Sequence, residues 1–169
     1  MARPDLSRIP DFFHGYIRQV KGNDLAEVFK TQGLEVIPFL DNIAPEKTGY
    51  RYAEGKWSMK EVLQHIIDAE RIFAYRALCI ARKDSTAFPG FDENTYAENS
   101  AADKRVWKDL VEEFRVVRRS TELLYASFDS VQLETSGTAS GKSTYVLGIG
   151  FIITGHVSHH FNILKERYC

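Results

Sequence analysis

Apolar residues recur at intervals of three and four along four stretches of the chain, which is the spacing of helices that each bury one face. The pattern predicts long helices over about residues 24–42, 58–83, 100–127 and 146–167, and a short amphipathic helix over residues 10–20. No segment shows a convincing alternation of apolar and polar residues, as a half-buried strand would. The expected fold class is therefore all-α, a four-helix bundle.

Local signals at the helix starts support these boundaries. Asp24 is a candidate N-cap for the first long helix. Ser58 is followed three residues later by Glu61, the pattern of a capping box, at the start of the second. The candidate caps of the third and fourth long helices are Ser100 or Asp103, and Ser143 or Thr144.

Two long polar segments connect the predicted helices. Residues 84–99 have Pro89-Gly90 at their centre and are long enough to cross an end of the bundle, so the helix order need not be simply up and down. Residues 128–143 are expected to form a polar loop, and its last residues belong to the sequence GKST (residues 141–144). A phosphate-binding loop is not expected there, because only three residues separate Gly137 from Gly141 where that motif needs four.

Composition predicts an ordinary soluble protein with one domain, over residues 1–169. With 22 basic and 23 acidic residues, the net charge of −1 offers no footprint for nucleic acid or an anionic membrane. Arg115, Arg118 and Arg119 alternate with glutamates, so we expect a solvated face of ion pairs rather than a basic patch. The longest apolar stretch, residues 145–153, is too short to span a membrane.

The location expected for the protein is the cytoplasm. The first ten residues are polar and contain no apolar run, so they do not form a signal peptide. The two cysteines belong to no CxxC pair and are expected to be reduced. Cys79 is expected to fill the core, and Cys169 is the terminal residue.

The last predicted helix contains three of the five histidines of the chain. His156 and His160 lie on its apolar face, within a wedge of roughly 80°, and are one turn apart. At this i, i+4 spacing both imidazoles can point at one metal ion. His159 lies about 100° around the helix from His160 and is expected at the boundary or on the surface. The alternative for the pair is that both are core residues hydrogen-bonded to buried polar groups.

A third ligand is needed, because two imidazoles rarely hold a metal alone. His65 is the one histidine of the second predicted helix, and it lies at the edge of that helix's apolar stripe. Three neutral imidazoles suit divalent zinc, nickel, copper or iron, and three protein ligands leave a coordination position open. The predicted metal site is therefore His65, His156 and His160. No HExxH motif is present, so a zinc protease is not indicated.

No catalytic residue can be assigned from the sequence. Arg76 shares the face of His65 but stands about 16 Å further along the helix, so it is expected to order the end of the bundle. Tyr96, in the crossing connection, is a candidate substrate contact. Three acids near His65 are candidate bases that serve equally well as surface acids or caps: Glu61, Asp68 and Glu70.

The chain resembles the DinB/YfiT-like superfamily of metal-dependent hydrolases over most of its length. The resemblance rests on KWSMKEVLQHIIDAERIFAYRALCIAR (Lys56–Arg82), on the PGFDENTYAENS connection after it, and on GHVSHHFNILKERY (Gly155–Tyr168). It implies a four-helix bundle of unusual connectivity, often dimeric, in which three histidines bind zinc or nickel. Carried over by position, those histidines are again His65, His156 and His160.

What the resemblance implies about the reaction is less uniform. Members include thiol transferases that conjugate bacillithiol, mycothiol-dependent isomerases, and many proteins called hydrolases from the metal alone. The expected function is a metal-dependent hydrolase or low-molecular-weight-thiol transferase that acts on a small molecule as a homodimer. The alternative is a non-catalytic, dimeric metal-binding module of a stress response. Gly148, Gly150 and Gly155 permit the close helix approach that an interface, or simply the core, would use.

Overall fold

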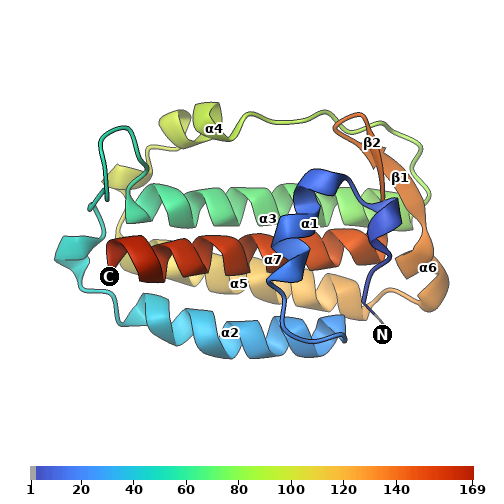
Figure 1. Ribbon diagram of the computed structural model, residues 1–169, viewed down its shortest axis with the longest axis horizontal. Coiled ribbons are helices and arrows are strands. Elements are labelled where there is room, and N and C mark those ends of the chain that lie inside the picture. Colours follow the sequence, from blue (N-terminus) through green and yellow to red (C-terminus); the bar gives the residue numbers. More distant parts are fainter. Residues whose placement is uncertain (1–2) are drawn as a thin grey trace.

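The computed structural model describes residues 3–169, and four long helices dominate them. These are α2 (Leu25–Asp41), α3 (Met59–Ala81), α5 (Trp107–Ala126) and α7 (Val146–Ile163). They lie side by side along the long axis of the molecule, with α2 and α3 each packed on both α5 and α7 (Figure 1). The predicted four-helix bundle is confirmed.

The order of the helices is not simply up and down. The connection from α3 to α5 runs back along the length of α3, so that α3 and α5 point in the same direction (Figure 1). This connection contains a short helix that the hydrophobic pattern did not predict, α4 (Glu93–Asn99), which Asp92 caps by accepting a hydrogen bond from the Thr95 amide at 2.7 Å. The expected departure from a simple up-and-down order is confirmed, but the connection runs along the bundle rather than across its end.

The caps predicted for α2 and α3 are present. The Asp24 side chain accepts from the amides of Ala26 and Glu27, and Ser58 with Glu61 forms the reciprocal capping box. The prediction for the third long helix was wrong, because α5 begins only at Trp107. Ahead of it the 3₁₀ turn η4 (Ala102–Lys104) follows Ala101, whose left-handed φ of 52° interrupts helical geometry.

Residues 128–143 are not the polar loop that the sequence predicts. They contain α6 (Ser130–Glu134) and most of a hairpin of β1 (Ser136–Ala139) and β2 (Lys142–Tyr145), paired antiparallel from Ser136↔Tyr145 to Ala139↔Lys142. The hairpin turn is Ser140-Gly141, with φ of 53° and 71°. Strands of four residues are too short for an alternation to register, and the N-cap of α7 is Tyr145 rather than Ser143 or Thr144.

Arg118 is a further correction to the sequence-based picture. Arg115 and Arg119 form the expected surface ion pairs, with Glu112 and Glu122. Arg118 instead lies in the interior, 2% exposed, and pairs with the equally buried Glu70. Helical periodicity does not determine whether Arg118 is buried, because the partner that permits its burial is 48 residues away in the chain.

Short elements complete the chain. The N-terminal segment forms 3₁₀ turns η1 (Leu6–Arg8) and η2 (Asp11–Phe13) and helix α1 (His14–Arg18), and α1 packs across α7. A 3₁₀ turn, η3 (Pro45–Lys47), precedes α3, and a π-helical turn, η5 (Leu164–Tyr168), ends the chain. None of the helices in residues 3–169 is both long and apolar enough to cross a membrane.

Buried apolar residues form two clusters along the bundle, and the histidines lie where the clusters meet. On α3, Ala69 belongs to one cluster and Ile66 to the other. On α7, Ile153 belongs to the first and Val157 to the second. His156 lies between Ile153 and Val157, and His65 lies one turn before Ala69, so both are near the junction of the clusters.

Candidate metal centre

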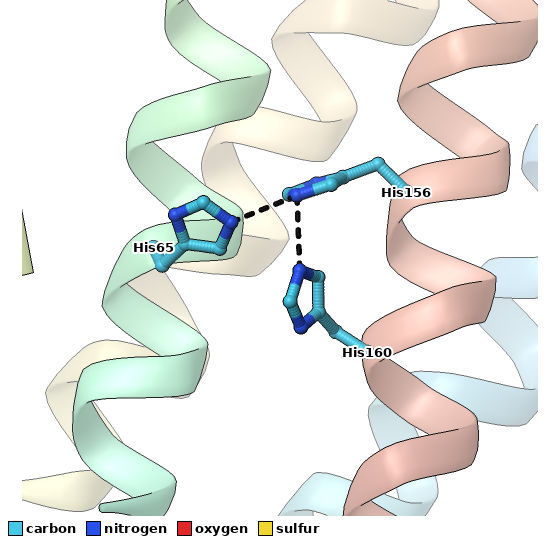
Figure 2. Close-up of side chains that lie close together, drawn as sticks. All are labelled: His65, His156 and His160. Carbon is cyan, nitrogen blue, oxygen red and sulfur yellow. Dashed lines mark hydrogen bonds between the residues drawn. The ribbon is translucent and has the colours of Figure 1, made fainter. Parts of the chain in front are cut away.

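Three imidazoles from two helices converge in the interior of the bundle (Figure 2). His65 extends from α3, and His156 and His160 extend from successive turns of α7. The Nε2 atom of His156 lies 2.9 Å from Nε2 of His65 and 3.1 Å from Nε2 of His160. One potential ligand atom from each residue lies within 4.8 Å of the other two, so the structure brings together the three histidines that the sequence singled out.

The donor set fits a shared cation better than it fits a hydrogen-bond network. A ring nitrogen has either one proton or one lone pair, so it makes one well-directed hydrogen bond. The Nε2 atom of His156 faces two other ring nitrogens at hydrogen-bond distance, and it satisfies one of them. Three lone pairs directed at one divalent cation would satisfy all three nitrogens at once.

Burial keeps these imidazoles in the form that binds metal. His65 is 9% exposed and His156 is 6% exposed. Burial lowers the pKa of His160 to about 3 and that of His65 to about 4, and it lowers the pKa of His156 well below its usual value. The negative charge of Glu93 raises the pKa of His65 and so opposes part of the effect of burial. All three rings are therefore neutral near pH 7, and neutral imidazole is the metal ligand.

The three histidines, from here on called the triad, lie in the wall of a cavity of about 240 Å³. Aromatic rings make up much of the lining and pack against the ligands: Trp57 lies 4.8 Å from the His65 ring, Tyr16 lies 5.6 Å from the His156 ring, and Phe73 lies 6.2 Å from it. These contacts orient the imidazoles and exclude water from their apolar sides. The other lining residues are Phe12, Phe13, Ala69, Arg76, Phe91, Glu93 and Ser140.

A glycine sets the distance between α1 and the triad helix. A Cβ at Gly155 would lie 2.6 Å from the carbonyl carbon and oxygen of Tyr16, closer than side-chain atoms approach backbone. The absence of a side chain lets α1 lie directly on α7, which brings Tyr16 over His156 and over His159 at 4.9 Å. Gly155 thus serves a contact within the chain.

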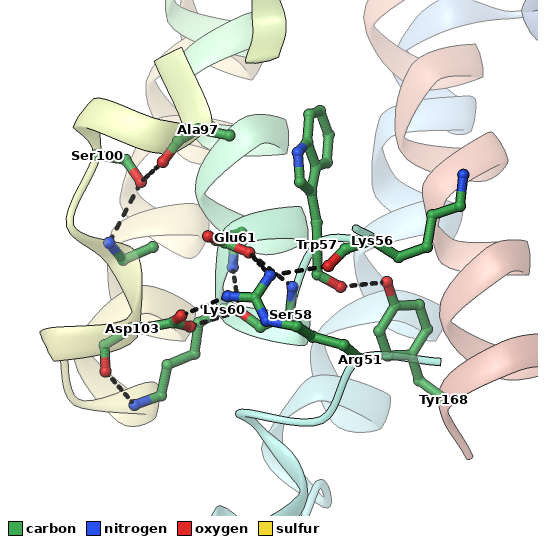
Figure 3. Close-up of polar contacts among 11 residues, drawn as sticks. Arg51, Lys56, Trp57, Ser58, Lys60, Glu61, Ala97, Ser100, Asp103 and Tyr168 are labelled. Carbon is green, nitrogen blue, oxygen red and sulfur yellow. Dashed lines mark hydrogen bonds and ion pairs between the residues drawn. The ribbon is translucent and has the colours of Figure 1, made fainter. Parts of the chain in front are cut away.

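The start of α3, which determines where His65 lies, is held by a polar network (Figure 3). Arg51 donates to Glu61 at 2.5 Å and to Asp103 at 2.7 Å, and Asp103 also accepts from the Ser58 hydroxyl at 2.6 Å. Asp103 comes from the segment before α5, so the network ties the crossing connection to the first turn of α3. Tyr168 joins it from the chain end by donating to the Trp57 carbonyl at 2.6 Å.

The other histidines do not join the group. His159 is half-buried at the boundary, as expected, and contacts Tyr16. His14 lies close to the carbonyls of Leu6 and Ile9, at 3.0 and 2.9 Å, and orders the N-terminal turns.

The candidate bases from the sequence have other partners and do not line the cavity. Asp68 accepts from Gln64, Glu70 pairs with Arg118, and Glu61 belongs to the capping box. The ring centres of Tyr96 and Phe91 are 5.2 Å apart, and Tyr96 does not line the cavity either.

Two charged residues of the cavity were missed or misplaced by sequence reasoning. Glu93 was not considered, although Tyr96 of the same connection was a candidate substrate contact, because nothing local shows which residues of the connection line the cavity. Arg76 was assigned to the end of the bundle, yet it lines the same cavity as His65. The signal was present, since Arg76 follows His65 by three helical turns on the same face.

Comparisons with known proteins agree with this architecture. The structure of YfiT from Bacillus subtilis, described as a probable metal-dependent hydrolase with an unusual four-helix bundle topology, matches with a TM-score of 0.71. The match covers 98% of this chain and 91% of that one at 14% sequence identity, so it bears on the fold alone. No curated protein sequence matches significantly. The sequence profile of the DinB superfamily matches residues 29–164, and the chain belongs to this superfamily.

Proposed function

We propose that the protein is a metal-dependent enzyme that binds a divalent cation through His65, His156 and His160 and acts on a small molecule in the adjoining cavity. The observation that supports this most directly is the convergence of three neutral imidazole nitrogens, for which hydrogen bonding alone leaves a nitrogen without a partner. Zinc or nickel is the proposed metal, since imidazole nitrogen suits both. The homodimer and the cytoplasmic location stay predictions.

The surroundings of the triad favour a catalytic over a purely structural role. A structural metal site is closed by four protein ligands, whereas a catalytic site retains an exchangeable position. Here three ligands lie beside a cavity of about 240 Å³, which leaves one side for water or substrate. A divalent cation held by these residues would lower the pKa of a water or a thiol bound to it, so that either could act as a nucleophile near neutral pH.

Glu93 is the proposed proton acceptor. It is the one carboxylate among the described residues that lines the cavity, and its negative charge raises the pKa of His65 against the effect of burial. Its position on α4, in the crossing connection, makes it exposed enough to exchange protons with solvent. The aromatic lining shields the remaining sides from water.

Both hydrolysis and thiol transfer fit this arrangement. In hydrolysis, Glu93 takes a proton from the attacking water; in thiol transfer, it takes the proton of the thiol. We propose the two as alternatives, to be separated with a panel of esters and amides and a panel of thiols with electrophiles. Turnover in one panel by metal-loaded protein, absent in the His160→Ala variant, would identify the reaction.

Elemental analysis of the purified protein beside its His156→Ala/His160→Ala variant tests the proposal first. The expected result is close to one divalent metal per parent chain after incubation with zinc or nickel, and loss of that metal in the variant. His159→Ala is the matched control and should retain the metal, because His159 lies outside the group. Failure of the parent to bind either metal would refute the proposed centre.

A further inference from the structure

Arg76 is a buried arginine without an acidic partner. It is 6% exposed, and no carboxylate in residues 3–169 lies within 4 Å of its guanidinium. The one hydrogen bond that it makes with the described part of the chain runs from Nη2 to the Pro89 carbonyl, at 2.6 Å. The other buried arginine, Arg118, binds Glu70 through two hydrogen bonds and Gln32 through a third. The two buried guanidinium groups thus differ: Arg118 has a carboxylate partner and Arg76 has none among the described residues.

The unpaired charge faces the cavity rather than the packed core. Arg76 lines the cavity of the triad and also a recess of about 20 Å³ next to it. Its guanidinium carbon lies 5.7 Å from the centre of the Phe73 ring and 6.0 Å from that of the Phe91 ring. The Nε and Nη1 atoms have no hydrogen-bond partner among the described residues. Burial without a counter-charge lowers the pKa of Arg76, a direction that an anion in the cavity would reverse.

A second unsatisfied polar group lies in the same recess. Thr144, on β2, is 4% exposed, and its Oγ1 atom is buried with no hydrogen-bond partner. Ser140, at the hairpin turn, lines both the recess and the main cavity. A buried hydroxyl without a partner is unfavourable, so its presence in the same recess as an unpaired guanidinium indicates a place for a hydrogen-bonding ligand.

We propose that Arg76 and Thr144, with Ser140 at the rim, form a subsite that binds a carboxylate group of the substrate. The planar guanidinium offers two parallel donors to a carboxylate, and the Thr144 hydroxyl offers a third. The inference rests on the proposed function, whose substrate class it names: a small carboxylic acid with its reactive group at the other end.

The position of the subsite sets the size of this substrate. The guanidinium carbon is 5.7 Å from the Phe73 ring centre and that centre is 6.2 Å from the His156 ring centre, so the subsite and the triad are at most about 12 Å apart. The Phe73 ring is near both groups, so it would contact a ligand that spans them. Glu93, the other charged residue of the cavity, makes no ion pair with Arg76.

Nuclear magnetic resonance of the Arg76 Nε–H group tests the subsite without using catalysis. The probes are 3-phenylpropanoate and its neutral counterpart 3-phenylpropanamide, titrated into metal-free, ¹⁵N-labelled protein because a carboxylate would also bind zinc at an open position. The Arg76 signal is identified by its loss in Arg76→Lys. We expect the carboxylate to shift this signal and to bind roughly 10- to 100-fold more tightly than the amide, the range for hydrogen bonds to a charged group. In Arg76→Gln the two probes should bind equally, and Thr144→Val should lose part of the preference.

The same titration of the His156→Ala/His160→Ala variant separates this proposal from that of the metal centre. The preference for the carboxylate should persist there, because the subsite uses none of the histidines. An Arg76 signal that the carboxylate leaves unmoved in the parent overturns the subsite, as does a preference that survives in Arg76→Gln. The parent measurement decides the matter even if Arg76→Gln fails to fold.

Discussion

Arg118 and Glu70 form an ion pair in the interior of the bundle, and removal of one partner is expected to be far more damaging than removal of both. The guanidinium donates from Nε and Nη2 to the two carboxylate oxygens, at 3.0 and 2.8 Å, with side chains 2% and 1% exposed. Its Nη1 atom donates to Gln32, which in turn donates to the Thr154 carbonyl at 2.7 Å. One residue from each of α2, α3, α5 and α7 is thus connected.

The size of the effect follows from the burial of the pair. Arg118→Met leaves the Glu70 carboxylate in the interior without a cation, which is expected to lower the free energy of unfolding by about 3–5 kcal/mol. For a chain of this size that corresponds to a fall in Tm of roughly 6–20 °C. In Glu70→Leu/Arg118→Met the remaining charge is gone as well, and the loss should shrink, since an apolar pair of similar volume often replaces a buried ion pair at little cost.

Urea unfolding of the parent, both single variants and the double variant measures this coupling. Arg119→Met is the matched control: Arg119 is 66% exposed and pairs with Glu122 one turn along the same helix, so its loss should change stability by less than about 1 kcal/mol. If the two single losses simply add in the double variant, or if Arg118→Met behaves like the control, the reasoning about the buried pair is refuted.

Two further predictions concern the surroundings of the triad. Gly155→Ala should destabilise the protein by about 1–3 kcal/mol in thermal unfolding, because the new Cβ meets the Tyr16 backbone. Gly33→Ala is the control and should stabilise the protein slightly, because a Cβ there has no atom within 4 Å. Equal effects of the two substitutions would contradict the close approach of α1 and α7. Metal-free protein should lose stability as the pH falls from 6.5 toward 5, since the unfolded histidines take up protons there while the buried His65 and His160, with pKa values of about 4 and about 3, do not. Each such histidine contributes up to about 1.4 kcal/mol per pH unit. Urea unfolding at each pH measures how steeply the free energy of unfolding depends on pH. This dependence should be shallower in His65→Gln/His160→Gln, and an unchanged dependence would count against the burial of the two histidines.

Much of the bundle could be predicted because its information is local. The capping box of Ser58 and Glu61 and the three-and-four spacing of apolar residues involve neighbours within one or two turns, and they located α3 and α7 to within a few residues. The histidines followed from the same periodicity. Once each helix face was known, His65, His156 and His160 were all expected to point inward, and the structure brings them within 4.8 Å.

What depends on contacts between distant segments could not be predicted from local patterns. The β1–β2 hairpin is too short to produce an alternation, and it is held by pairing with Phe88 of the crossing connection. Arg118 looked like a surface residue until its buried partner Glu70 was known. Glu93 entered the cavity because the connection folds back along α3.

The sequence by itself thus determined the helices, their buried faces and the identity of the three converging imidazoles, since these follow from backbone periodicity and nearest-neighbour chemistry. Only the tertiary structure decided which charges are buried, paired or directed into the cavity. Burial of a charge is favourable only with a partner or a ligand, and whether one is present depends on residues tens of positions away. Arg118 and Arg76 show the two outcomes: the first has Glu70 beside it, and the second faces a cavity beside the triad.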